Sequence, residues 1–220
     1  IMHNTVKNLI YIEDEIKSKV NDIDNNKLPK IIAVSKTFSM DKILPLVEHG
    51  HIDYGENRVQ EALDKWTDVK LKNKNIKLHL IGGLQTNKVK LALKIFDYIH
   101  SLDSKKLANK IADEQIKQVK KPKIFIQINI GNENQKSGIK KDELVDFYKF
   151  CKQLNLDIIG LMCIPPANEV STEYFKKMFL LSNDMNLSEL SMGMSSDYLE
   201  ATKNHATYLR IGSSIFGKRN

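Results

Sequence analysis

The sequence has few of the residues that cross-link a chain and no segment that would span a membrane. Cys151 and Cys163 are the only cysteines in 220 residues, with no C-x-x-C pair and no Cys/His spacing typical of a metal site. We therefore expect two reduced thiols and no metal ion. The apolar runs are of strand length, which argues against a transmembrane helix. The amphipathic start does not resemble a secretory signal, so we expect a cytoplasmic protein without membrane contact.

Arginine is scarce as well. Arg58, Arg210 and Arg219 are the only three, although the chain has 34 basic residues and a formal net charge of +7. The remaining basic residues are lysines spread along the whole chain. Proteins that bind nucleic acid more often concentrate basic and aromatic residues on one element. The positive charge therefore predicts a solvated, lysine-rich surface and no nucleic-acid partner.

The chain does contain a regular alternation of short apolar runs and helical patterns. A helical spacing of apolar residues covers 2–23. Strands are predicted at 30–35, 51–54, 77–81, 97–101, 123–130, 157–162, 188–192 and 207–211. Helices are predicted between them at 40–49, 56–66, 87–95, 103–118, 140–154, 171–183 and 195–204.

Such alternation predicts parallel strands joined by crossover helices. Eight strands suggest one closed (β/α)8 TIM barrel over residues 1–220, with an extra helix in front. A doubly wound open sheet is the alternative, because 220 residues is short for this barrel. No repeat or flexible linker divides the chain, so one domain is expected.

The ends of the last two predicted strands combine glycine with hydroxyl residues, in SMGMSS (191–196) and RIGSS (210–214). Loops at these two places of a barrel often bind phosphate, since glycine lets backbone N–H groups approach an anion. Ser195 and Ser213 would add hydroxyl donors. A helix starting near Ser195 would direct its positive end at the same anion. Ordinary turns with helix-capping serines are the alternative.

The first strand, in IIAVSK, delivers Lys36 to the same rim. Because strand 8 adjoins strand 1 in a closed barrel, Lys36 would lie near the phosphate site and near Arg210. An amine close to such a cation should lose some of its protonation, and a neutral amine can form a Schiff base. Such a lysine and a phosphate cradle are the minimal apparatus for pyridoxal 5′-phosphate (PLP). A solvated or structural lysine is the alternative.

Three further residues are predicted to have structural roles. Glu56 follows the second predicted strand, where a carboxylate would cap the next helix. Trp66, at helical spacing, is predicted to be a packing residue. Cys163, at the end of the sixth predicted strand, is predicted to be a small apolar filler rather than a nucleophile.

Seven segments, in order, make the sequence similar to the pyridoxal-phosphate-binding homeostasis proteins, the YggS/PROSC family. They are AVSKT, YGENRVQE, HLIGGLQTNK, INIGNENQKSGI, GLMCIP, LSMGMSSD and RIGSSIFG, between residues 31 and 217. The resemblance implies a barrel like the N-terminal domain of alanine racemase, without that enzyme's second β-domain. Two positions differ from the commonest family residues: at Gly83 the family usually has proline or histidine, and at Ser213 it usually has threonine.

The resemblance assigns the cofactor contacts in this chain. It implies that Lys36 carries PLP as a covalent aldimine. Ser195, Gly212 and Ser213 correspond to the phosphate cradle, and Arg210 to the arginine near the pyridine nitrogen.

It further assigns pocket residues around the cofactor: Asn57, His79, Ile81 and Met192. Lys136 corresponds to a second lysine near the pocket mouth, with a role in cofactor exchange.

The resemblance also implies little or no turnover. An arginine beside the pyridine nitrogen weakens the ring as an electron sink. The tyrosine that serves alanine racemases as second base belongs to the second domain, which these residues do not include. The expected function is to hold PLP in vitamin B6 homeostasis, with PLP-dependent apo-enzymes as recipients and a monomeric state. A PLP-dependent amino-acid racemase, or an aldolase-type barrel using Lys36 without cofactor, are the alternatives.

Overall fold

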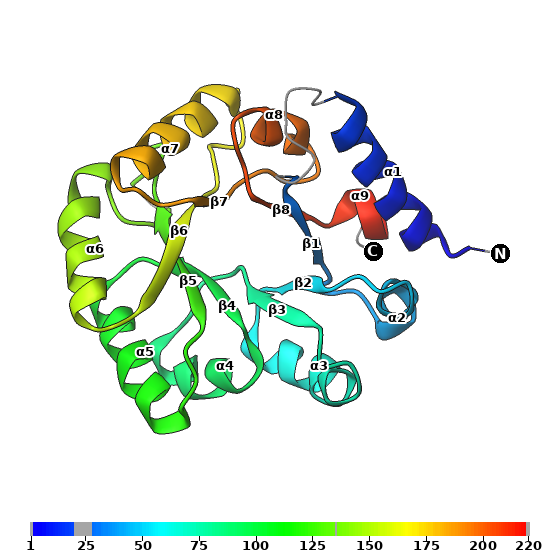
Figure 1. The fold of residues 1–220 in the computed structure, drawn as a ribbon, viewed down its shortest axis with the longest axis horizontal. Helices are drawn as coiled ribbons and strands as arrows, with labels where there is room; N and C mark the ends of the chain where they lie inside the picture. Colours follow the sequence, from blue (N-terminus) through cyan, green and yellow to red (C-terminus); the bar gives the residue numbers. More distant parts are fainter. Residues whose placement is uncertain (1, 20–27, 135, 219–220) are drawn as a thin grey trace.

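The computed structural model describes residues 2–19, 28–134 and 136–218. Eight parallel strands close into a barrel in the order β1 to β8, with helices around the outside (Figure 1). The strands are β1 (Lys30–Val34), β2 (Asp53–Glu56), β3 (Lys77–Leu80), β4 (Tyr98–Leu102), β5 (Lys123–Ile128), β6 (Asp157–Cys163), β7 (Glu189–Ser191) and β8 (Tyr208–Ile211). The closed order confirms the predicted barrel and excludes the open sheet.

The helices lie between the strands. They are α1 (Asn4–Lys19), α2 (Met40–Glu48), α3 (Val59–Lys72), α4 (Val89–Ile95), α5 (Lys105–Gln118), α6 (Leu144–Gln153), α7 (Thr172–Asp184), α8 (Tyr198–Lys203) and α9 (Ser213–Phe216). Short 3-10 turns, η2 (Thr86–Lys88) and η3 (Lys141–Glu143), precede α4 and α6. Residues 20–23 of the first predicted helix lie outside the described residues. No helix in the described part of the chain is long and apolar enough to cross a membrane.

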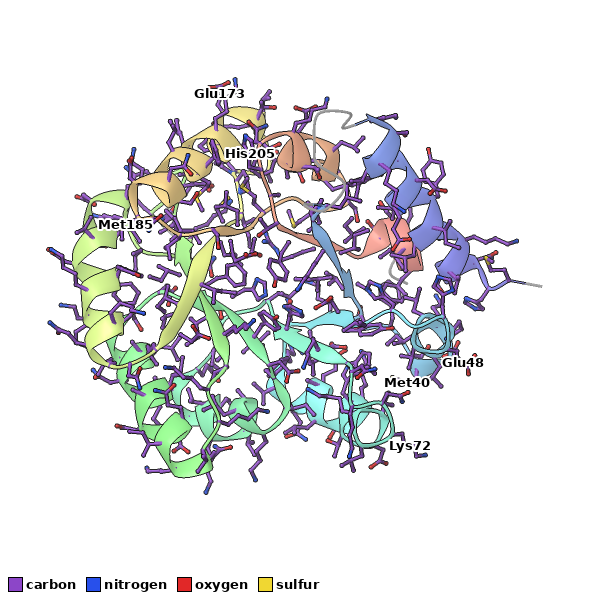
Figure 2. All side chains as sticks on the ribbon, viewed as in Figure 1. Met40, Glu48, Lys72, Glu173, Met185 and His205 are labelled. Carbon is purple, nitrogen blue, oxygen red and sulfur yellow. The ribbon has the colours of Figure 1, made fainter. Side chains whose placement is uncertain are left out.

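Side chains alternate between the two faces of each strand, and this alternation produces two apolar clusters. One fills the barrel interior, where Figure 2 shows side chains crowded between the strands. It consists of Ile32, Tyr98, Phe125, Met162 and Tyr208. The larger cluster packs the outer faces of the strands against the helices. The barrel is therefore a packed core, and a site can open only at its ends.

The N-terminal helix covers the seam between the first and last strands. Leu9, Ile12 and Ile16 of α1 are buried. Figure 1 shows α1 beside α9, and Asn8 Nδ2 donates to the Ile215 backbone oxygen at 2.8 Å. The helix that opens the chain thus supports the short helix that closes it.

The structure corrects three predicted boundaries. β2 lies two residues later than predicted, because Ile52 is outside the strand and 44% exposed. The following helix begins at Val59 rather than at residue 56, and α8 begins at Tyr198 rather than at residue 195. The four-residue α9 was not predicted, since so short a segment shows no helical period.

Strands β6 and β7 approach closely at Gly160. A Cβ added there would lie 1.9 Å from the backbone oxygen of Glu189, an atom held in the sheet. Only glycine is compatible with this contact.

Gly160→Ala should therefore lower the free energy of unfolding by about 1–3 kcal/mol, because the strands must move apart. Denaturant unfolding followed by circular dichroism measures the change. Gly83→Ala is the matched control, since a Cβ at Gly83 would have no atom within 4 Å. Equal stability of the two variants would contradict the close approach.

Candidate functional site

A cavity of about 690 Å³ opens at the C-terminal ends of the strands, a size suited to a small ligand. It is lined by Val34, Lys36, Asn57, Ile81, Ile164, Met194, Ser195, Ser196, Arg210, Gly212, Ser213 and Lys218. The structure thus brings most of the sequence-predicted site residues into one cavity. His79 and Met192 are fully buried and do not line it.

The β1–β8 pairing brings the two ends of the chain together at this cavity. Ile32 pairs with Arg210 and Ala33 with Ile211, so both strands finish at the same level. Lys36 follows β1, and Gly212 and Ser213 follow β8. A Cβ on Gly212 would lie 3.4 Å from Val34, which shows how tightly the two strand ends pack.

The loops after β7 and β8 are joined by a hydrogen bond. The Ser214 backbone N–H donates to Ser195 Oγ at 3.2 Å. The expected helix near Ser195 begins instead at Tyr198, with Asp197 as its N-cap. Asp197 Oδ1 accepts from the Met194 backbone N–H at 2.8 Å. The predicted helix start near Ser195 was therefore three residues too early, and the Asp197 side chain makes no capping hydrogen bond to α8. That this helix directs its positive end at an anion stays a prediction.

Arg210 is a buried cation on the cavity wall. Its Nη1 donates to Ser191 Oγ at 2.7 Å, and its Nη2 donates to the Cys163 backbone oxygen at 2.8 Å. Burial lowers the pKa of the guanidinium, although arginine remains charged in proteins. Burial also raises the pKa of the Cys163 thiol to about 12, so this cysteine is protonated at neutral pH.

Behind Arg210, a chain of hydrogen bonds crosses the barrel interior. His100 Nδ1 lies 2.8 Å from Ser191 Oγ, and His100 Nε2 lies 2.9 Å from His79 Nδ1. His79 Nε2 lies 2.8 Å from Asp53 Oδ1. We call Asp53, His79, His100 and Ser191 the interior relay. It links the guanidinium at the cavity to a carboxylate near the opposite end of the strands.

The chemistry of the relay fixes the direction of its protons. An ionised Asp53 only accepts, so His79 donates from Nε2 and accepts at Nδ1. His100 then donates from Nε2 and accepts at Nδ1, and the Ser191 hydroxyl donates to His100. Ser191 Oγ remains free to accept from Arg210. Every bond is satisfied with both histidines neutral, which agrees with the lowered pKa of each imidazole caused by burial.

Glu56 is placed differently from its predicted role. It is the last residue of β2 and fully buried, whereas α3 begins beyond it with Arg58 as N-cap. Glu56 Oε1 accepts from Ser35 Oγ at 2.7 Å and from Trp66 Nε1 at 2.9 Å. The prediction that Glu56 caps the helix was therefore wrong. Trp66 is buried as predicted, but it is also a hydrogen-bond donor.

Lys136 lies in another part of the surface. It lines an open, polar depression of about 1060 Å³ between the segment after β5 and helix α7, and not the cavity that contains Lys36. Its Nζ pairs with Glu133 Oε2 at 2.7 Å. Asn129 shapes this segment, because its side chain donates to the Glu133 backbone oxygen and accepts from the Glu133 N–H.

Comparisons with known proteins agree with the resemblance seen in the sequence. The family model "Alanine racemase, N-terminal domain" matches residues 13–220. A curated protein of Pasteurella multocida, named pyridoxal phosphate homeostasis protein, is 36% identical over 227 residues and covers 97% of both chains. A protein of the same name from Aquifex aeolicus is 38% identical over 200 residues, covering 86% of this chain and 87% of its own.

A solved structure has a similar fold. PipY from Synechococcus elongatus, with PLP bound, is 29% identical and has a TM-score of 0.84. The match covers 97% of this chain and 100% of that one. The predicted family and the alanine racemase-like barrel are thus confirmed.

The neutral histidines of the interior relay should make stability depend on pH. Their pKa values are lowered in the folded state, so the unfolded chain binds more protons below its own histidine pKa of about 6.5. Stability is then fully present above pH ~6.5 and falls, by up to about 1.4 kcal/mol per histidine and pH unit, as the solution is acidified.

Denaturant unfolding at several pH values between about 7.5 and 5.5 measures this slope. His100→Phe should be less stable at neutral pH but should show a shallower fall on acidification. His49→Gln replaces an exposed histidine at the end of α2 and is the control. An unchanged slope in His100→Phe would contradict a neutral relay.

Proposed function

This chain belongs to the family of pyridoxal phosphate homeostasis proteins, and we propose that its cavity binds PLP. The supporting observation is the convergence of three chemistries on one cavity: the Lys36 amine, the serine- and glycine-lined loops after β7 and β8, and the buried Arg210 guanidinium. These groups suit, in turn, the aldehyde, the phosphate and the pyridine nitrogen of PLP. The cavity volume of about 690 Å³ accommodates a molecule of this size. The PLP-bound structure of PipY supports the same ligand.

The proposed linkage is covalent. Lys36 Nζ adds to the aldehyde carbon of PLP, a C=N bond forms and water leaves, which gives a Schiff base. Ser195, Gly212 and Ser213 would hold the phosphate through hydroxyl and backbone donors. Asn57 and Ile81 line the remaining wall.

Arg210 makes the proposed site a weak catalyst. A guanidinium has donors only, so the pyridine nitrogen facing it would accept a hydrogen bond and stay unprotonated. A neutral ring is a poor electron sink. Among the lining residues in the described part of the chain, none is histidine, tyrosine, cysteine, aspartate or glutamate, and the amines are Lys36 and Lys218. The site therefore offers little acid–base chemistry beyond the anchoring lysine.

The proposed role is accordingly to store PLP and to release it to PLP-dependent apo-enzymes in the cytoplasm, with little or no turnover. The relatives named pyridoxal phosphate homeostasis protein support this role. We propose a monomer, because residues of this barrel alone line the cavity in the described part of the chain. Lys136, in its separate depression, would act in exchange rather than in anchoring.

Lys36→Ala should abolish the absorbance band at about 420 nm that a Schiff base of PLP with lysine gives. Lys218 lines the same cavity. The variant Lys218→Ala should nevertheless keep the band, since it leaves the anchoring amine of Lys36 in place. Spectra after addition of PLP, followed by borohydride reduction and mass spectrometry, measure both. If the wild-type protein gives neither a band nor a borohydride-stable adduct, the cofactor-free aldolase-type reading is favoured.

The storage role predicts no racemisation of L- or D-alanine by the PLP-loaded protein beyond that caused by free PLP. Polarimetry or chiral chromatography measures it. A rate well above this background that disappears in Lys36→Ala would establish a racemase instead.

A further inference from the structure

Lys36 lies in a turn that is strained at the next residue. The Phe38 backbone N–H donates to the Ser35 oxygen at 3.1 Å, which places Lys36 and Thr37 at the two central positions of a turn. Thr37 has a φ of 67°. A positive φ at this position is the signature of a type II turn, which ordinarily requires glycine or asparagine. A β-branched residue there is an outlier that persists only when its surroundings hold it.

Helix α3 supplies the groups that hold this turn. Lys65 Nζ donates to the Ser35 backbone oxygen at 2.8 Å. Glu61 Oε1 accepts from the Thr37 backbone N–H at 2.6 Å. Glu61 and Lys65 are four residues apart on the helix and pair with each other at 3.2 Å. The backbone is thus fixed on both sides of Lys36.

Glu56 anchors this arrangement below the turn. Its Oε1 accepts from Ser35 Oγ at 2.7 Å and pairs with Lys65 Nζ at 2.8 Å. Lys65 Nζ therefore donates to Ser35 and Glu61 and forms an ion pair with Glu56. A buried carboxylate with these partners is costly to disrupt, which makes it a rigid reference point for the strand end.

We propose that Glu56, Glu61 and Lys65, which we call the α3 clamp, are positioning residues that hold the strained turn and so direct Lys36 Nζ at the cofactor aldehyde. The proposal rests on the proposed function, because it concerns the same lysine. The three residues are not among those that line the cavity in the described part of the chain. An effect on the cofactor must therefore act through residues that do line the cavity, and among these Lys36 lies in the turn that the three residues hold.

The strain at Thr37 gives the clamp a specific consequence. Without the Glu61 contact, Thr37 is expected to relax to a negative φ, which rotates the peptide bond between Lys36 and Thr37 and redirects the lysine. Glycine at position 37 has no such preference and would keep the positive φ unaided. A variant at Thr37 should thus compensate for the loss of Glu61. A clamp that serves stability alone predicts no such compensation.

Glu61 is the residue to test, since its side chain is 26% exposed and its removal leaves Lys65 still paired with Glu56. Glu61→Ala should slow Schiff-base formation with added PLP by about tenfold to a hundredfold, the range that small misplacements of a reacting group produce. Glu61→Gln retains an acceptor for Thr37 and should recover most of the rate. Asp68 is an exposed acidic residue of the same helix. Asp68→Ala is therefore the control and should form the Schiff base at the wild-type rate.

The decisive variant is the double substitution Thr37→Gly with Glu61→Ala, which should react within about threefold of Thr37→Gly alone. Stopped-flow absorbance gives the rates. Binding of pyridoxine 5′-phosphate, which has no aldehyde, should be unchanged in all variants and shows that the cavity is intact.

The outcomes separate the two proposals. If the wild-type protein forms no adduct with PLP, the proposed function fails. If it does and Glu61→Ala reacts at the wild-type rate, the clamp is overturned. It is also overturned if Thr37→Gly gives no compensation or if pyridoxine 5′-phosphate binding is lost together with the rate.

Discussion

The pairing of β1 with β8 is the constraint on which the rest of the site depends. It brings Ile32 opposite Arg210 and Ala33 opposite Ile211. Because side chains alternate along each strand, Arg210 then faces inward at the level where β1 ends. The next residues of the two strands, from Ser35 to Thr37 and from Gly212 to Ser214, necessarily meet. Closure of the barrel thus creates the cavity, and neither end of the chain could form it alone.

Alternation along β2 divides the polar groups that support this seam. Asp53 faces the barrel interior and ends the interior relay, while Glu56 faces α3 and belongs to the α3 clamp. Gly55 lies between them, where a Cβ would lie 2.9 Å from Ile32. A four-residue strand thereby supplies one carboxylate to each network. A shift of one residue in its register would exchange the two faces and destroy both.

The two networks neutralise buried charge in different ways. The α3 clamp places its ammonium directly between carboxylates, so attraction acts over short distances. The interior relay instead separates Arg210 from Asp53 by two neutral histidines and a serine, each oriented by its neighbour. Oriented dipoles of this kind stabilise the cation without placing an anion at the cavity.

The site residues that directly follow a strand could be predicted from the sequence. The sequence did not predict how deep a side chain lies in the barrel, nor where a strand begins to within two residues. Lys36, Ser195 and Gly212 follow apolar runs whose ends are marked by polar residues, so the barrel fold places them. The family resemblance assigned His79 to the pocket, but no local pattern in this sequence tells how far below the rim a side chain lies, and His79 does not line the cavity.

Glu56 shows the second limit. The exposed Ile52 shifted the predicted strand, and a carboxylate read as a helix cap is in fact buried against Trp66. Its partners are Ser35, which follows β1, and residues of α3, so no spacing within the local sequence predicts these contacts. The left-handed conformation of Thr37 was equally invisible, because threonine is not a residue that predicts a positive φ.

These supporting groups distinguish a lysine that only follows a strand from one whose side chain is held in a defined orientation. The chain contains many lysines, and composition alone would make Lys36 one more solvated cation. Lys36 differs from these lysines because energetically unfavourable groups surround it: a strained threonine beside it, a buried carboxylate beneath it and a buried guanidinium across the cavity. Each is unfavourable in isolation, and the closed barrel brings each one the partners described above. Their convergence on one amine is the physical reason to assign it a function.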